Sequence, residues 1–421
     1  MKKYAIFLLF ALLFAVFLPA GAVSGEDGNV CFLKNGGQGD GSSPDGAVGS
    51  LREAVRLLSG GGTLVVCGEY SFSEYIGLSE KDGSANTSPI EVTSVWNGSD
   101  YRMQNGAAFC FGGPGGSANL SLAGDFVFHD ITLRTDGSSA ERAVICNAHS
   151  VEFGEGIVCE KRGQAPYLSI VGSSFDDALD GECSIVIKSG TYKNVYCAGR
   201  GAAFDGNARL NVSGGVFEGE VSSSGRGDGR SEITGDSFLN VSGGSFRSGI
   251  GALGDVGGEC EANISGGFFK GEMRFSGTKN TLVIDNGSFD DVGAFVFRVV
   301  EDEKKTTDGE AAQVPNSVTV NGVSGDLDTL VGKLKNAGVE PAVNAEEGYE
   351  PAETAAETFP ATEGPDEPET DDGPEETGPE TAPPSRGDST DRGNAVIVTA
   401  LVALCVMSAA VFALRRFRLR S

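Results

Sequence analysis

The chain has 421 residues, and its 59 aspartates and glutamates against 32 lysines and arginines give a net charge of −27. A chain this acidic disfavours nucleic acid as a partner, because neutralising phosphates requires a basic surface that no segment supplies. Only two histidines and no Cys-x-x-Cys pair are present, which disfavours a zinc site, and we expect no metal site.

The N-terminus predicts export. Lys2 and Lys3 precede an apolar run over residues 4–18, and Ala20-Gly21-Ala22 offers a small-residue cleavage site. This order of basic, apolar and small residues is typical of a secretory signal peptide. We therefore expect residues 1–22 to be removed.

A short helix is predicted next. Ser50-Leu-Arg-Glu53 is a capping box, and Leu51, Ala54 and Val55 begin an apolar stripe at helical spacing. Gly60-Gly-Gly62 ends this helix, and residues 63–67 are expected to form the first strand. A helix at this point would cover the open edge of the first coil.

One phrase recurs through the middle of the chain, an alternating apolar run followed by a small-residue corner and an aromatic residue. The three clearest copies and three degraded copies occupy residues 210–217, 239–246, 262–269, 168–175, 185–192 and 282–289. Steps between successive corners are 17, 25, 29, 23 and 20 residues. A short and variable period predicts an all-β solenoid with loops inserted between coils.

The aromatic residue of each copy is expected to stack on the next inside the coil. The predicted column consists of Phe175, Tyr192, Phe217, Phe246, Phe269 and Phe289. Left-handed coils favour a strict hexapeptide register, whereas the spacing here varies by more than ten residues. We therefore expect a right-handed parallel β-helix with three short sheets.

At its beginning the predicted solenoid resembles a known group. The Gly-, Asp- and Ser-rich stretch Lys34–Leu51, followed by Gly61-Gly-Thr-Leu-Val-Val-Cys-Gly-Glu-Tyr70, resembles the start of pectin-lyase-like right-handed parallel β-helix proteins, many of them bacterial surface proteins. The resemblance covers roughly residues 31–300 and implies a β-helix with its N-terminal cap over residues 23–300. Members include polysaccharide lyases, hydrolases, adhesins and autotransporter passengers, so the fold does not choose an activity.

Residues 301–340 are expected to cap the far end. Ser317-Val-Thr-Val320 predicts a strand, and Leu327, Leu330, Val331 and Leu334 follow at helical spacing. Residues 341–394 then predict an acidic, disordered stalk, since residues 341–392 carry sixteen acids and two arginines among Pro, Thr and Gly.

The C-terminus predicts a membrane anchor. Residues 395–414 are twenty residues without a charge, close to the ~20 that cross a bilayer. Four arginines follow in residues 415–421, which by the positive-inside rule stay cytoplasmic. We expect a single-pass cell-membrane protein with its N-terminal part outside.

We expect no catalytic residues and no cofactor; in the alternative interpretation as an enzyme, Asp176, Asp177 and Asp180 are the catalytic candidates and Ca²⁺ is the cofactor they would hold. Such adjacent carboxylates hold Ca²⁺ in lyases or act as acid and base in glycoside hydrolysis. The hydrolases of the resembled family also carry Gly-His-Gly and Arg-x-Lys segments, which are missing here. The Phe128-His129-Asp130 sequence is a second candidate for acid–base chemistry, and His149 is the other histidine.

Arg226-Gly227-Asp228 is the candidate binding motif. It lies in a Gly- and Ser-rich loop over residues 222–232, and the same tripeptide recurs at residues 386–388. It resembles integrin-recognition loops, which present Arg and Asp on an exposed turn.

The cysteines allow two interpretations. Eight lie before the predicted membrane segment, and an even number in an exported chain allows four disulfides, one of them joining Cys31 and Cys67. Several occupy apolar strand positions, as Cys67 and Cys110 do, where a free thiol packs as a small apolar group.

The function expected from these patterns is an adhesive or structural role at the cell surface, with loops that bind an extracellular glycan or protein. The alternative is a membrane-tethered polysaccharide lyase or hydrolase that uses the three aspartates. Neither interpretation predicts the oligomeric state.

Overall fold

The computed structural model describes residues 29–112, 118–175, 177–300 and 316–344, which all belong to one compact unit, Met1–Ala355. The predicted signal peptide, membrane helix and cytoplasmic tail lie outside these residues, as does nearly all of the predicted stalk. The second unit, Ala356–Ser421, lies outside them entirely.

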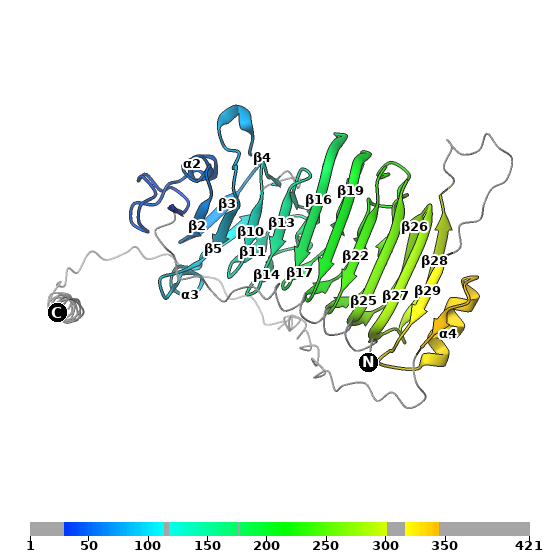
Figure 1. The fold of residues 1–421 in the computed structure, drawn as a ribbon. Coiled ribbons are helices and arrows are strands. Elements are labelled where there is room, and N and C mark those ends of the chain that lie inside the picture. Colours follow the sequence, from blue (N-terminus) through cyan, green and yellow to red (C-terminus); the bar gives the residue numbers. More distant parts are fainter. Residues whose placement is uncertain (1–28, 113–117, 176, 301–315, 345–421) are drawn as a thin grey trace, which may run out of the picture. The chain divides into compact units, whose positions relative to one another are not determined.

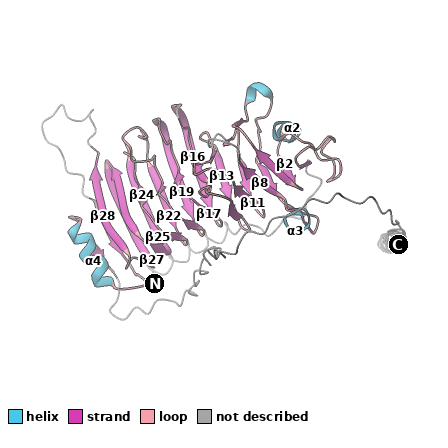
Figure 2. Ribbon diagram, turned by 180° about the vertical axis from the view of Figure 1, so that it is seen from behind, coloured by secondary structure: helices cyan, strands magenta, loops and turns pink. Residues whose placement is uncertain are grey.

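The described part is an all-β parallel solenoid (Figures 1 and 2). Each named strand pairs in parallel with strands of neighbouring coils, apart from the short hairpin of β6 (Val95–Trp96) and β7 (Ser99–Asp100) among the described strands. This confirms the predicted fold at the level of a parallel solenoid built from short repeats.

Two long sheets run along the solenoid, and a third, shorter sheet accompanies its first coils. The fifteen-stranded sheet contains β1 (Val30–Leu33), β2 (Gly62–Val66), β5 (Ile90–Thr93), β10 (Phe126–Phe128), β13 (Ser150–Phe153), β16 (Leu179–Ile187), β17 (Thr191–Tyr192), β19 (Phe204–Val212), β20 (Val216–Phe217), β22 (Ser237–Val241), β23 (Ser245–Phe246), β25 (Glu259–Phe269), β27 (Lys279–Ser288), β29 (Ser317–Val320) and β30 (Ala342–Val343). The four-stranded sheet contains β3 (Glu69–Phe72), β8 (Ala108–Phe111), β11 (Thr132–Thr135) and β14 (Val158–Lys161). The nine-stranded sheet contains β4 (Ile76–Gly77), β9 (Leu120–Ser121), β12 (Ala143–Ile145), β15 (Ser169–Val171), β18 (Val195–Tyr196), β21 (Val221–Ser222), β24 (Ile250–Ala252), β26 (Gly271–Gly277) and β28 (Val292–Val299).

The core is built from ladders of inward side chains in strict register. One ladder in the fifteen-stranded sheet runs through paired, buried residues of eight coils: Phe126, Val151, Ile185, Leu210, Leu239, Ala262, Leu282 and Val318. Because side chains alternate between the two faces of a strand, the period-two pattern of the sequence places these residues inside.

An aromatic column fills the corner that follows these strands. Tyr192, Phe217, Phe246, Phe269 and Phe289 stack in order, with ring centroids 4.8–6.0 Å apart. The preceding glycine has a positive φ in each of these repeats, as at Gly244, whose φ is 104°. Five of the six predicted corners, at Gly190, Gly215, Gly244, Gly267 and Gly287, are therefore confirmed, as are five of the six predicted column residues.

Phe175 was wrongly predicted to belong to this column. Residues 168–175 enter the nine-stranded sheet through β15, and Phe175 packs against a small separate cluster of buried residues, Ala143, Ile145, Val171 and Tyr196. The column continues instead through Phe153, whose ring meets Tyr192 edge-on at 5.7 Å. A strand of any of the three sheets has the same apolar alternation, so the pattern does not tell which face of the coil it forms.

A polar ladder runs along the outside of the same repeats. Asn240 Nδ2 donates to Asn211 Oδ1 at 2.8 Å, and Asn263 Nδ2 donates to Asn240 Oδ1 at 3.2 Å. The recurring asparagine of the repeated phrase therefore joins three successive coils by amide–amide hydrogen bonds.

Helices lie at both ends of the solenoid. In α2 (Leu51–Leu57), the Ser50 side chain accepts a hydrogen bond from the Glu53 amide, as the capping box predicted. The first strand is β1, which pairs with β2, so residues 63–67 are not the first strand as predicted. The partner of β1 lies about thirty residues further along the chain, so a strand this short leaves no local signal in the sequence.

At the far end, β29 and α4 (Leu327–Asn336) form where they were predicted, and α4 buries Leu330 and Leu334. The strand β30 then pairs with β29, so the folded part continues to residue 344, past the predicted boundary at residue 340. The remaining described helices are α3 (Tyr101–Asn105) and the 3₁₀ turn η2 (Glu80–Asp82).

Candidate functional site

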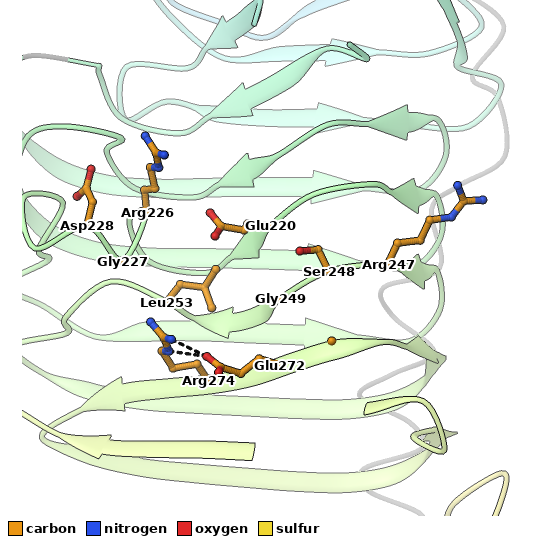
Figure 3. Close-up of a pocket in the computed structure, with 11 residues that line it drawn as sticks. Glu220, Arg226, Gly227, Asp228, Arg247, Ser248, Gly249, Leu253, Glu272 and Arg274 are labelled. Atoms are coloured by element: carbon orange, nitrogen blue, oxygen red, sulfur yellow. Dashed lines mark hydrogen bonds and ion pairs between the residues drawn. The ribbon is translucent and has the colours of Figure 1, made fainter. Parts of the chain in front are cut away.

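A groove of about 520 Å³ opens on the outer face of the nine-stranded sheet (Figure 3). Its walls come from three coils, around β21, β24 and β26 and the loop before Ser231. Six charged side chains line it: Glu220, Arg226, Asp228, Arg247, Glu272 and Arg274. No segment of the chain holds all of these residues, so only folding brings them together.

The groove exists because β24 lacks side chains where its neighbours carry them. Val221, Ile250 and Met273 are paired across the sheet, so Gly249 lies between Glu220 and Glu272. A Cβ atom at Gly249 would meet nothing closer than 3.6 Å, which leaves the floor of the groove open. Gly251 has a φ of 137°, and a Cβ atom there would lie 1.9 Å from the Arg274 carbonyl oxygen. Glycine at 251 is thus required for the close approach of β24 and β26.

Each carboxylate in the groove is held by one of its two oxygens. Glu220 Oε2 accepts from the Tyr196 hydroxyl at 2.7 Å, and Glu272 Oε1 accepts from Arg274 Nε at 2.8 Å. Asp228 Oδ1 accepts from the Arg230 amide and the Ser231 hydroxyl, both at 3.1 Å. Burial, together with the nearby Glu220 carboxylate, raises the pKa of Tyr196, so its hydroxyl remains a donor.

The loop that carries Arg226 is anchored by buried serines. Ser222 Oγ donates to the Gly225 carbonyl oxygen at 2.8 Å, and Ser224 Oγ donates to that of Gly254 at 3.0 Å. Beyond Gly225 the chain turns outward, and residues 226–230 are exposed. A rigid base below an exposed turn presents Arg226 and Asp228 in a fixed position beside the groove.

The predicted binding residues Arg226, Gly227 and Asp228 therefore form one wall of the groove. The other walls were not predicted: Glu220 lies six residues before Arg226, and the remaining lining residues, Arg247 to Arg274, lie 21 to 48 positions after it. The Gly-Ile-Gly sequence at 249–251, which interrupts a strand pattern, was the one local signal for a depression there. The second Arg-Gly-Asp, at residues 386–388, lies outside the described residues.

The predicted catalytic aspartates lie elsewhere. Asp177 and Asp180 are both exposed, and Asp180 is paired in register with Asp205 of the next coil. Asp176 lies outside the described residues. In the part of the chain that the structure describes, no group of three or more His, Cys, Asp and Glu side chains is arranged to hold a metal ion.

The two histidines are separated. His129 Nδ1 lies 3.2 Å from Asp130 Oδ2, and Arg102 lies 3.7 Å from the same carboxylate. His149 precedes β13, whereas His129 follows β10, so they stand at opposite ends of two parallel strands. Burial lowers the pKa of His149.

A second polar cluster on the nine-stranded sheet is satisfied internally. Ser169 and Asn194 both donate to Glu141 Oε1, and Arg200 forms an ion pair with Glu141 Oε2. The guanidinium of Arg200 also lies over the Phe175 ring. Both oxygens of this carboxylate are occupied, in contrast to those of the groove.

All eight cysteines in the described residues are free thiols, so Cys31 and Cys67 are not joined. Cys183 and Cys197 come closest, with sulfur atoms 4.0 Å apart in the core. The structure therefore agrees with the second interpretation, in which the cysteines are free thiols packed as small apolar groups.

Fold and groove together define a parallel solenoid with a polar groove on one sheet. Compared with models of protein families, with curated proteins and with solved structures, the chain matches none of them. Among the described residues there is also no helix with the length and apolar character needed to span a bilayer.

Proposed function

We propose that the protein is a cell-surface recognition protein whose solenoid binds an extracellular glycan or protein in the groove beside Arg226. The observation that carries this proposal is an open polar groove bordered by an exposed, rigidly anchored loop. Binding residues are typically placed in this way, on loops held by a rigid scaffold. No chemical step is assigned to the groove.

The proposal includes a right-handed coil of the pectin-lyase-like kind and a membrane anchor. Right-handedness is supported by the general preference for right-handed crossovers between parallel strands. Export and anchoring are supported by the sequence patterns at residues 1–22 and 395–414. A topology assay on intact cells, with a protease-accessible tag placed after residue 22, tests the anchor.

The binding function is tested with the full chain in lipid nanodiscs on arrays of glycans and matrix proteins. We expect binding that is lost in Gly249→Leu, because the new side chain fills the floor of the groove. Gly60→Leu is the matched control, since a Cβ atom at this exposed glycine meets nothing within 4 Å. Equal binding by both variants would place recognition elsewhere. Release of unsaturated or reducing sugars by the wild-type chain would favour the lyase or hydrolase alternative instead.

A further inference from the structure

The charges that line the groove cancel. Three arginines and three carboxylates line it, so the formal net charge of the lining side chains is zero. Arg274 is already paired with Glu272 at 2.6 Å and Arg247 with Glu218 at 3.4 Å. A polyanion would therefore find few uncommitted cations here, and it would approach a chain of net charge −27.

In each groove carboxylate, one of the two oxygens accepts no hydrogen bond from the described residues. Glu220 Oε1, Glu272 Oε2 and Asp228 Oδ2 take part in no hydrogen bond within the described residues, while the other oxygen of each group is held. Three oriented acceptors of this kind require a ligand that donates hydrogen bonds. Donation to a carboxylate is stronger than donation to a neutral acceptor, so each position contributes to affinity.

The same ligand must also accept hydrogen bonds. Arginine has only donors, and the Arg226 guanidinium forms no ion pair within the described residues, although it lines the same groove and stands near Asp228 (Figure 3). A hydroxyl group both donates and accepts, so neighbouring hydroxyls on one ring match an alternation of carboxylates and guanidiniums. Leu253 adds an apolar contact on the groove wall.

We propose that the groove binds a neutral, hydroxyl-rich glycan, an inference that depends on the proposed recognition function and names its ligand class. A polyuronate would bring carboxylates against Glu220, Asp228 and Glu272, which costs free energy through like-charge contact. A basic peptide would meet Arg226, Arg247 and Arg274 with the same result. The groove volume of about 520 Å³ lies within the range of ligand pockets.

Three ligand classes separate these possibilities. The full chain in nanodiscs is titrated with neutral hexose and N-acetylhexosamine oligosaccharides, with oligogalacturonate and with an oligolysine peptide, at low and at high salt. We expect the neutral oligosaccharides to bind with a dissociation constant that changes little with salt, because no net charge is neutralised.

Two variants tie this binding to the acceptors. Glu220→Gln keeps the shape but removes the charge, and we expect about tenfold weaker binding of the neutral glycan. Glu259→Gln is the control, because Glu259 is an exposed carboxylate of the fifteen-stranded sheet, paired with Lys279 at 2.9 Å. Unfolding midpoints of both variants, measured by circular dichroism, separate a loss of binding from a loss of folding.

The outcomes are distinct. Tightest binding of a neutral glycan, weakened by Glu220→Gln and abolished by Gly249→Leu, supports the inference. Tighter binding of oligogalacturonate or oligolysine in the same groove, with a steep loss at high salt, overturns the neutral-glycan inference but leaves the recognition function intact. If none of the three ligand classes binds, the inference is overturned. If the chain also binds nothing on the glycan and matrix-protein arrays, the proposed function is overturned as well.

Discussion

Phe269 shows how one side chain joins three coils. Its ring stacks on Phe246 at 5.0 Å and on Phe289 at 4.8 Å, and the side chain is buried. We expect Phe269→Ala to cost about 3–5 kcal/mol of unfolding free energy, because a cavity opens between two rings that remain in place. Urea unfolding followed by circular dichroism measures this loss.

The neighbouring Phe268 is the control, since its side chain is 46% exposed on the other face of the same strand. Phe268→Ala should change the unfolding free energy by no more than about 0.5 kcal/mol. Similar losses for the two alanine variants would show that the column does not stabilise the solenoid.

Because of the buried thiols, we expect the stability of the protein to vary with pH in the alkaline range. Burial raises the pKa of Cys31 to about 11 and that of Cys260 to about 12. An unfolded thiol has a pKa of about 8.5. The stability that the neutral buried thiols contribute is therefore fully present below about pH 8.5, and it is lost as the pH rises toward 11–12. We expect the unfolding midpoint in urea to fall over this range.

The variant Cys260→Ala tests whether this thiol causes the loss of stability at alkaline pH. The variant should be less stable at neutral pH, because it leaves a cavity, but its stability should fall less steeply above pH ~8.5 than that of the wild type. A midpoint that rises with alkaline pH, or an unchanged slope, would contradict the role of this thiol.

At the scale of single elements, β24 depends on the conformation of one glycine. With its φ of 137° and the Arg274 carbonyl oxygen 1.9 Å from the position of a Cβ atom, Gly251 leaves no room for alanine. We expect Gly251→Ala to destabilise the protein by at least about 1–3 kcal/mol, through backbone strain and displacement of β26.

Gly249→Ala is the comparison within the same strand, because its Cβ atom would make only ordinary contacts. Thermal unfolding of the two variants measures the difference. We expect a change of about 0.5 kcal/mol or less for Gly249→Ala. Equal destabilisation would mean that β24 tolerates no substitution at all, whatever the backbone conformation.

The elements that could be predicted are those whose evidence is local. The period-two alternation of residues 210–212, the capping box at Ser50 and the helical stripe of α4 all lie within a few residues, and each formed where it was expected. Long-range information was missing. Phe175 was assigned to the wrong sheet and β1 was overlooked, because the face of the coil and the partner strand depend on distant residues.

The candidate site divides in the same way. Arg226, Gly227 and Asp228 could be found as a motif because they are contiguous, and Gly and Ser around them indicated a loop. Glu220, Arg247 and Glu272 could not be added to them, since only the register between three coils places these side chains around Gly249.

For the whole solenoid, contacts between neighbouring coils imply that the two ends can unfold separately. Trp96, the single tryptophan, packs near the α2 end, whereas circular dichroism reports on all coils. Leu51→Ala removes a buried side chain from α2, so we expect it to lower the urea midpoint of Trp96 fluorescence more than that of circular dichroism.

Leu334→Ala is the matched variant at the other end, because this leucine is fully buried in α4. It should shift the circular dichroism transition and leave the fluorescence transition of Trp96 nearly unchanged. If the two probes move together in both variants, the solenoid unfolds as a single cooperative unit.

The repeated phrase at residues 210–217, 239–246 and 262–269 has an evolutionary consequence. Each copy presents nearly the same inner ladder and the same asparagine to the coil on either side. Recombination between two copies would delete or duplicate one winding, and the flanking windings would still fit each other. Descendants of this gene can therefore differ in length by whole coils while both terminal helices keep their original neighbours.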